Sequence, residues 1–180
     1  MQKEILFSEA KLRKYPEPVH ISIIRDKNGR YNPISMAWAM FTSIEPPMVA
    51  ISIGLERYSF EAIEHSGEFV FVLPSESMGE AVRFFGSTSG RDIDKLKELG
   101  IATQPATKID NVLLSDAAAN FECVVKSKVR SGDHMIYAGL IVASHINTEP
   151  ARRLYSVEPR VFAGVTRTGL EKEESWKSKN

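Results

Sequence analysis

The chain has 180 residues, 43% of them hydrophobic and 26% charged, and its 23 basic residues balance its 23 acidic residues. These values predict one globular domain without the net charge that would attract nucleic acid or an anionic membrane. One cysteine excludes an intrachain disulfide framework, and the four histidines lack ligand spacing, so we expect no metal site. The N-terminus has no apolar core of signal-peptide length, and the longest apolar run, at 135–143, is far too short for a membrane span, which favours a soluble, cytoplasmic protein.

The N-terminal third reads as a lead-in followed by a hairpin. Residues 1–18 are charged and end in Pro16-Glu17-Pro18, so we expect an extended segment with one helical turn. Residues 19–25 (VHISIIR) alternate as in a half-buried strand. Asn28-Gly29 predicts a hairpin into one long strand from 30 to 43, in which Pro33 requires an edge or a bulge.

The middle of the chain alternates strands with short helices. Strands are predicted at 48–54 (MVAISIG) and 68–73 (EFVFVL). Between them we expect a helix that Ser59 caps and Gly67 ends. Further helices are expected from the capping-box pattern Ser77-Met78-Gly79-Glu80 to about Phe85, and over 92–99.

The last third is strand-like. Residues 120–129 alternate between apolar and polar, with Phe121 and Cys123 on one side of a predicted strand and Glu122 on the other. Further strands are predicted at 134–146, which runs back along the first, and at 160–166. Together the segments predict a mainly β fold, namely a β-barrel with inserted short helices. We expect this barrel to form a single domain over 19–168, preceded by the lead-in (1–18) and followed by a polar tail (169–180).

Two polar segments are candidates for binding an anion. In Arg57-Tyr58-Ser59, a guanidinium and a hydroxyl stand at a predicted helix start, where free backbone N–H groups favour a phosphate; the alternative is a plain cap with a solvated arginine. The loop from Gly86 to Arg91 offers Ser87, Ser89, Gly90 and a cation, and Lys95 follows one turn into the next helix; the alternative is a flexible connection.

Two further features suit an aromatic ligand. Ser35-Met36-Ala37-Trp38 places small side chains beside an aromatic one, which would let a flat ring lie against the backbone, although a barrel bend or an ordinary core tryptophan also explains it. His134 follows a Gly-Asp turn and would meet a substrate at a site mouth, or be a surface histidine.

In order, these features resemble the flavin reductase-like family, whose fold is the FMN-binding split barrel, and especially its flavoredoxin-type branch. The resemblance covers roughly residues 16–146. It rests on the segments PEPVHISIIRDKNGRYNPISMAW, SIEPPMVAISIGLERYSFEAIEHSGEFVFVLP, GSTSGRDIDKLKELGI, FECVV and SGDHMIYAG.

The resemblance implies a homodimer that binds FMN noncovalently near the subunit interface. Ser35, Met36, Ala37 and Trp38, with Ser52, Ile53 and Gly54, would line the ring and ribityl group. Arg57, Tyr58 and Ser59 would hold the phosphate, assisted by Ser87, Ser89, Gly90, Arg91 and Lys95. His134 would lie on the nicotinamide or substrate side. One departure is Leu140, which follows Gly139 where many family reductases carry an acidic residue.

The function implied is an oxidoreductase that passes hydride from NAD(P)H to flavin and electrons on to a small-molecule or protein acceptor. Two alternatives stay open from the sequence. One is an FMN-containing electron carrier that a protein partner reduces. The other is a non-redox module that binds a phosphate ligand.

Overall fold

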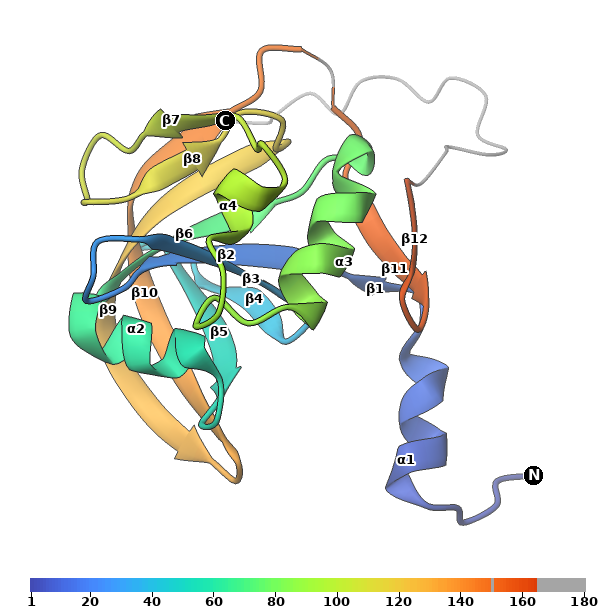
Figure 1. Ribbon diagram of the computed structural model, residues 1–180. Coiled ribbons are helices and arrows are strands. Elements are labelled where there is room, and N and C mark those ends of the chain that lie inside the picture. The colour runs from blue at the N-terminus through green and yellow to red at the C-terminus, as the bar shows by residue number, and fades with distance from the viewer. Residues whose placement is uncertain (150, 165–180) are drawn as a thin grey trace, which may run out of the picture.

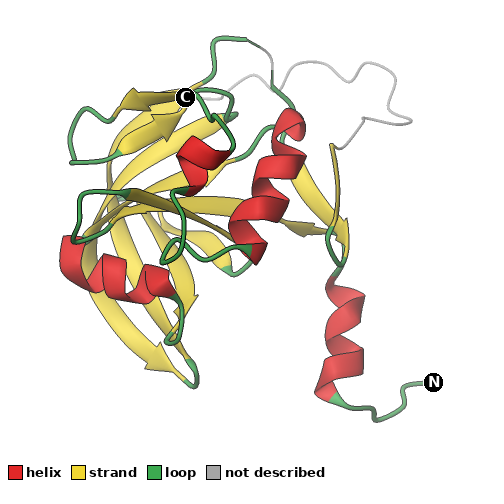
Figure 2. Ribbon diagram, in the orientation of Figure 1, coloured by secondary structure: helices red, strands yellow, loops and turns green. Residues whose placement is uncertain are grey.

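The structure is a computed structural model that describes residues 1–149 and 151–164. Its main element is a sheet of seven antiparallel strands that curls into an open barrel (Figures 1 and 2). In sheet order the strands are β3 (Tyr31–Met36), β2 (His20–Arg25), β6 (Glu68–Leu73), β9 (Ala119–Ser131), β10 (His134–Ile146), β5 (Met48–Gly54) and β4 (Ala39–Ser43). The predicted mainly β fold is confirmed.

The strand expected from 30 to 43 is in fact two strands, β3 and β4, and the single-strand prediction is wrong. β3 pairs with β2 and β4 pairs with β5, so the two lie at opposite edges of the sheet. The chain crosses between the edges at Ala37 and Trp38, where the amide of Ser52 donates to the carbonyl of Trp38 at 3.0 Å. Pro33 lies on edge strand β3, as its missing donor requires.

The local signals at the helices were only partly right. α2 (Tyr58–Ser66) ends at Gly67, whose φ of 66° is left-handed, as predicted. The expected caps at its start and at the start of α3 (Gly79–Ser87) are absent: Arg57 and Met78 occupy the N-cap positions without side-chain cap bonds. The predicted helix 92–99 shortens to α4 (Lys95–Glu98), because Asp94 caps it by accepting from the Lys97 amide at 3.2 Å.

Short elements surround the barrel. The helical turn expected in the lead-in is present as α1 (Phe7–Ala10) and the 3-10 turn η1 (Lys11–Lys14), which project from the barrel in Figure 1. Several short elements escaped sequence reasoning: β1 (Glu17–Pro18), β7 (Thr103–Pro105), β8 (Val112–Leu114), β11 (Leu154–Glu158) and the 3-10 turn η2 (Glu76–Met78). β12 (Val161–Gly164) occupies the described part of the strand predicted at 160–166, while the predicted tail, 169–180, lies outside the described residues.

Two clusters of buried apolar side chains form the core of the protein. One, around Ile51, Phe69 and Tyr137, fills the barrel and includes Cys123, which is fully buried as expected. The other, around Ile21 and Phe85, lies between the sheet and α3. Strand β2 is covered on both faces, so its polar residues His20 and Ser22 are buried as well. The prediction that 19–25 forms a strand with only one buried face is therefore wrong.

Glu122 was expected on the polar side of its strand, but its side chain is fully buried. Its carboxylate accepts hydrogen bonds from the amides of Thr107 (2.8 Å), Lys108 (2.6 Å) and Ile109 (3.1 Å), and His145 Nε2 lies 2.7 Å away. Burial opposes ionisation, but these hydrogen bonds outweigh it and lower the pKa of Glu122 to about 2. The carboxylate therefore fastens the segment between β7 and β8 to the barrel.

Within residues 1–149 and 151–164, no helix is both long enough and apolar enough to cross a membrane.

Candidate functional site

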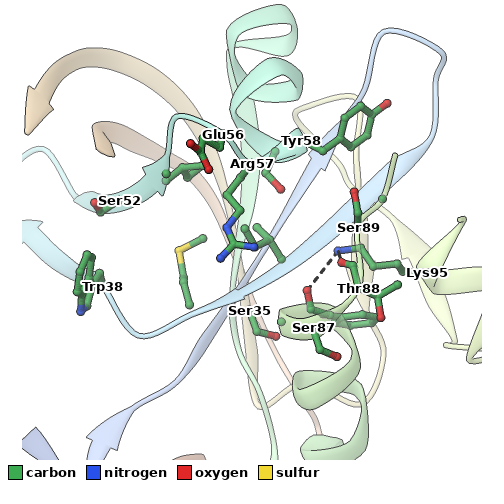
Figure 3. A pocket seen from close by; sticks show the side chains of 18 of the residues that line it. Ser35, Trp38, Ser52, Glu56, Arg57, Tyr58, Ser87, Thr88, Ser89 and Lys95 are labelled. Atoms are coloured by element: carbon green, nitrogen blue, oxygen red, sulfur yellow. Dashed lines mark hydrogen bonds between the residues drawn. The ribbon is translucent and has the colours of Figure 1, made fainter. Parts of the chain in front are cut away.

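A cavity of about 660 Å³ opens where the bend between β3 and β4, the end of β5, the start of α2 and the loop after α3 meet (Figure 3). Every candidate site residue named from the sequence lines it. These are Ser35, Met36, Ala37, Trp38, Ser52, Ile53, Gly54, Arg57, Tyr58, Ser59, Ser87, Ser89, Gly90, Arg91, Lys95 and His134. The tertiary structure thus brings segments from four parts of the chain into one pocket.

One end of the cavity is aromatic. The ring of Trp38 is tilted at 50° to that of His134, with 4.9 Å between their centroids, and Trp38 is 48% exposed. The reading of Trp38 as ordinary core is wrong, because the bend between β3 and β4 turns it out of the sheet. His134 Nδ1 lies 2.7 Å from the Asp133 carboxylate, which leaves Nε2 on the side of Gly54, at the pocket.

Arg57 supplies an available positive charge in the middle of the cavity. In Figure 3 its guanidinium lies between Trp38 and Ser52 on one side and Ser89 and Lys95 on the other. Within the described part of the chain, the Arg57 side chain has no hydrogen-bond or ion-pair partner. It also stands at the start of α2, where the first backbone N–H groups lack an intrahelical acceptor and favour an anion.

Ser59 does not cap α2, and its buried hydroxyl is instead hydrogen-bonded to Asn32 on strand β3. Asn32 Nδ2 donates to Ser59 Oγ at 2.9 Å, and both residues are nearly inaccessible. The serine oxygen accepts this bond, and its own proton has no acceptor among the described residues, so it can donate to a group in the pocket.

Lys95 is a buried cation at the end of the cavity that lies opposite Trp38 (Figure 3). Its side chain is 3% exposed, and Nζ donates to the carbonyls of Phe85 and Thr88, at 3.2 Å each. Burial, and then the charge of Arg57, lower the pKa of Lys95 to about 8, so it is still a cation at neutral pH. Among the described residues only two of its three donors find an acceptor, which leaves the third for a ligand.

The segment from Gly86 to Arg91 begins inside α3, which extends to Ser87, two residues past the predicted end at Phe85. Ser87 Oγ donates to the carbonyl of Arg83 at 2.9 Å, and Ser89 Oγ accepts from the Arg91 amide at 3.1 Å. A Cβ on Gly90 would lie 1.9 Å from Asn32 Oδ1, so only glycine fits this position. These contacts hold the segment against the barrel, where it forms one wall of the cavity.

Tyr58 and Arg91 line the cavity, but their polar groups are engaged elsewhere. Tyr58 Oη donates to the Asp26 carboxylate at 2.7 Å. The Arg91 guanidinium forms an ion pair with Glu61. Neither group is therefore directed at the centre of the pocket.

Ser35 brings to the pocket a hydroxyl group that finds no hydrogen-bond partner in the described part of the chain. Its Oγ is buried and, within the described residues, has no hydrogen-bond partner. A buried hydroxyl without a partner is costly, and a ligand that brings its own hydroxyl groups would satisfy it. With an aromatic end, an unpaired arginine and a buried lysine, the cavity fits a flat ring carrying a polar chain and a phosphate, as FMN does.

Sequence reasoning missed several lining residues: Lys14, Ile34, Glu56, Phe85, Gly86, Thr88 and Asp92. Gly86 and Thr88 belong to the hydroxyl-rich loop and could have been named with it. Lys14 lies in the N-terminal lead-in, and no local pattern relates it to the site. Within the described ranges there is no group of three or more His, Cys, Asp or Glu side chains that could hold a metal ion.

The fold is that of the flavin reductase-like split barrels. An FMN-binding protein from Thermus thermophilus superposes with a TM-score of 0.83, at 18% identity over 96% of this chain and 100% of that one. The flavoredoxin of Desulfovibrio vulgaris (Miyazaki F) gives 0.79, at 20% identity over 98% and 100% of the two chains.

The family model described as flavin reductase like domain matches residues 12–164, and the chain belongs to this family. Among its relatives, a flavin reductase of Pseudomonas putida is 25% identical over 81% of this chain and 82% of its own. An uncharacterised protein of Pyrococcus abyssi is 30% identical over 72% and 73%. Family membership supports flavin binding and an oxidoreductase role.

Proposed function

We propose that the protein binds FMN noncovalently in this cavity and acts in the cytoplasm as an NAD(P)H-dependent oxidoreductase of the flavin reductase and flavoredoxin type. The observation that carries the proposal is the unpaired Arg57 in a cavity whose other end is aromatic. The named relatives agree with it, since they include a flavin reductase and an FMN-binding protein.

The chain would hold the cofactor by three sets of groups. The ring and ribityl chain would lie along Ser35, Met36, Ala37 and Trp38, and along Ser52, Ile53 and Gly54. Ser35 Oγ would bond a ribityl hydroxyl. The phosphate would meet Arg57, the Ser59 hydroxyl and the first N–H groups of α2, with Lys95 behind them. Bound FMN would supply the redox chemistry, accepting hydride and passing electrons to an acceptor.

His134 would position the nicotinamide or the acceptor at the ring end. Its imidazole is anchored to Asp133 and lies against Trp38, far along the cavity from Lys95 (Figure 3 shows Trp38 and Lys95 at opposite sides). We expect His134→Ala to lower the rate of flavin reduction by NADH or NADPH about tenfold while changing the FMN dissociation constant less than about threefold. Loss of bound flavin in this variant would contradict the placement.

We also propose a homodimer whose interface is the outer face of β4, β5, β9 and β10. This face exposes Met40 (63%) and Val129 (60%), and its hollow of about 570 Å³ shares Trp38 and His134 with the flavin cavity. Exposed apolar side chains that gather on one sheet face are typical of an interface. The second subunit would therefore border the site.

Met40→Glu is expected to shift the protein from dimer to monomer, measured by sedimentation velocity, because it would bury a charge in the interface. Val161→Glu, an apolar-to-acidic change at a 47% exposed residue of β12, is the matched control. A dimer of unchanged affinity in Met40→Glu would remove this face from the interface.

The proposed function is tested in two steps. FMN is added to the purified protein, unbound FMN is removed, and the absorbance of the retained flavin is measured at about 450 nm. The protein is then mixed anaerobically with NADH or NADPH. Retained flavin that bleaches with either nucleotide is the expected result. Retained flavin that does not bleach would favour a carrier reduced by a protein partner. Failure to retain flavin would contradict both redox readings and leave a module for another phosphate ligand.

A further inference from the structure

Three side chains form a connected group at the phosphate end of the cavity. The Arg91 guanidinium carbon lies 5.5 Å from the centroid of the Tyr58 ring, and the same guanidinium pairs with Glu61. Tyr58 is adjacent to Ser59, and Arg91 follows Gly90, so the group borders the residues proposed to meet the phosphate. We call Tyr58, Glu61 and Arg91 the end wall.

Tyr58 is held in place from behind. Its hydroxyl donates to Asp26 at 2.7 Å, and Arg30 donates to the same hydroxyl at 3.3 Å. Asp26 is itself 2% exposed and accepts from the amides of Asn28 (2.8 Å) and Arg30 (2.9 Å). The ring therefore has little freedom to move when a ligand enters.

The backbone that carries Arg91 is held as well. Gly90 packs directly on Asn32, and Ser89 Oγ accepts from the Arg91 amide. Lys95 bonds the carbonyl of Thr88 and so fixes the start of the same loop. Only the outer part of the Arg91 side chain, which is 55% exposed, and its partner Glu61, which is 57% exposed, are free to open.

From this arrangement we propose that the end wall selects a flavin mononucleotide over a flavin dinucleotide, and that Arg91 acts as a steric stop rather than as a phosphate ligand. The inference rests on the proposed function. FAD differs from FMN by an adenosine monophosphate joined to the phosphate, so it extends the ligand from the end where the wall stands. Because Glu61 already neutralises Arg91, the arginine adds little attraction for the phosphate itself.

Binding FAD would require Arg91 to leave both Glu61 and the Tyr58 ring. An exposed ion pair and an exposed cation–π contact are each weak, so their combined loss corresponds to about a threefold to tenfold penalty on FAD. Once Arg91 is removed, the fixed Tyr58 ring offers a surface on which adenine can stack. Shortening Arg91 should therefore help the dinucleotide selectively.

The test measures dissociation constants of FMN, FAD and riboflavin for the flavin-free protein by fluorescence quenching. The unmodified protein should bind FMN more tightly than FAD. Arg91→Ala should tighten FAD about threefold to tenfold and change FMN and riboflavin less than about threefold. Glu61→Gln, which releases Arg91 without removing it, should lower the preference for FMN by a smaller factor. Arg83→Ala is the matched control, since Arg83 is exposed on α3 outside the cavity.

The outcomes separate the two proposals. If Arg91→Ala weakens FMN tenfold or more and leaves riboflavin unchanged, Arg91 is a phosphate ligand and the inference is wrong. If the unmodified protein binds FMN and FAD equally, the inference is also wrong, while the proposed function stands. If no flavin binds, the proposed function fails and this inference fails with it. Thermal unfolding of each variant checks that the fold is retained, as the exposure of both side chains leads us to expect.

Discussion

Arg57→Ala is expected to weaken FMN binding by about 1–3 kcal/mol, because the variant loses a charge-assisted hydrogen bond to the phosphate. Within the described residues the guanidinium has no competing partner, so it is available for a ligand. The dissociation constant would rise from about fivefold to more than a hundredfold. Arg57→Lys should recover only part of the loss, since an ammonium cannot make the forked contact.

Riboflavin provides the internal control for this prediction. It has the ring and ribityl chain of FMN without the phosphate, so its affinity should be nearly the same in Arg57→Ala and in the unmodified protein. Equal losses for FMN and riboflavin would place Arg57 against the ring or chain instead. An unchanged dissociation constant for FMN would remove Arg57 from the site.

Glu122→Gln is expected to lower the free energy of unfolding at neutral pH by about 2–4 kcal/mol, measured by urea denaturation. The amide keeps the shape of the side chain, but its NH₂ group would face backbone donors such as the Lys108 amide, which the carboxylate now satisfies at 2.6 Å. Glu68→Gln is the matched control, because Glu68 bonds the same segment through the Asp110 amide at 3.3 Å but is only half-buried. Equal losses in the two variants would contradict the special role of Glu122.

The same carboxylate predicts a pH dependence of stability. The pKa of Glu122 in the folded protein is about 2, below its ordinary value of 4.5. Its contribution is therefore complete above about pH 4.5 and is lost as the pH falls toward 2. Denaturation curves between pH 6 and about pH 2.5 should show a steeper loss of stability for the unmodified protein than for Glu122→Gln.

Several parts of the fold and the site could be predicted because they depend on neighbours in the chain. Asn28-Gly29 makes its hairpin, and Gly67 ends its helix in the left-handed conformation that favours glycine. Pro33 lies on an edge strand for want of a backbone donor. The site segments were recognisable from residue types alone, and one cavity gathers them.

The tertiary structure decided what depends on contacts between distant residues. Periodicity cannot show that a segment near Thr107 covers Glu122, so a glutamate expected outside is fully buried. It also cannot show that Asn32 holds Ser59, or that Glu61 occupies Arg91. In each case a side chain keeps the local chemistry that the sequence shows, while a partner far away in the chain determines whether that chemistry is satisfied internally or left for a ligand.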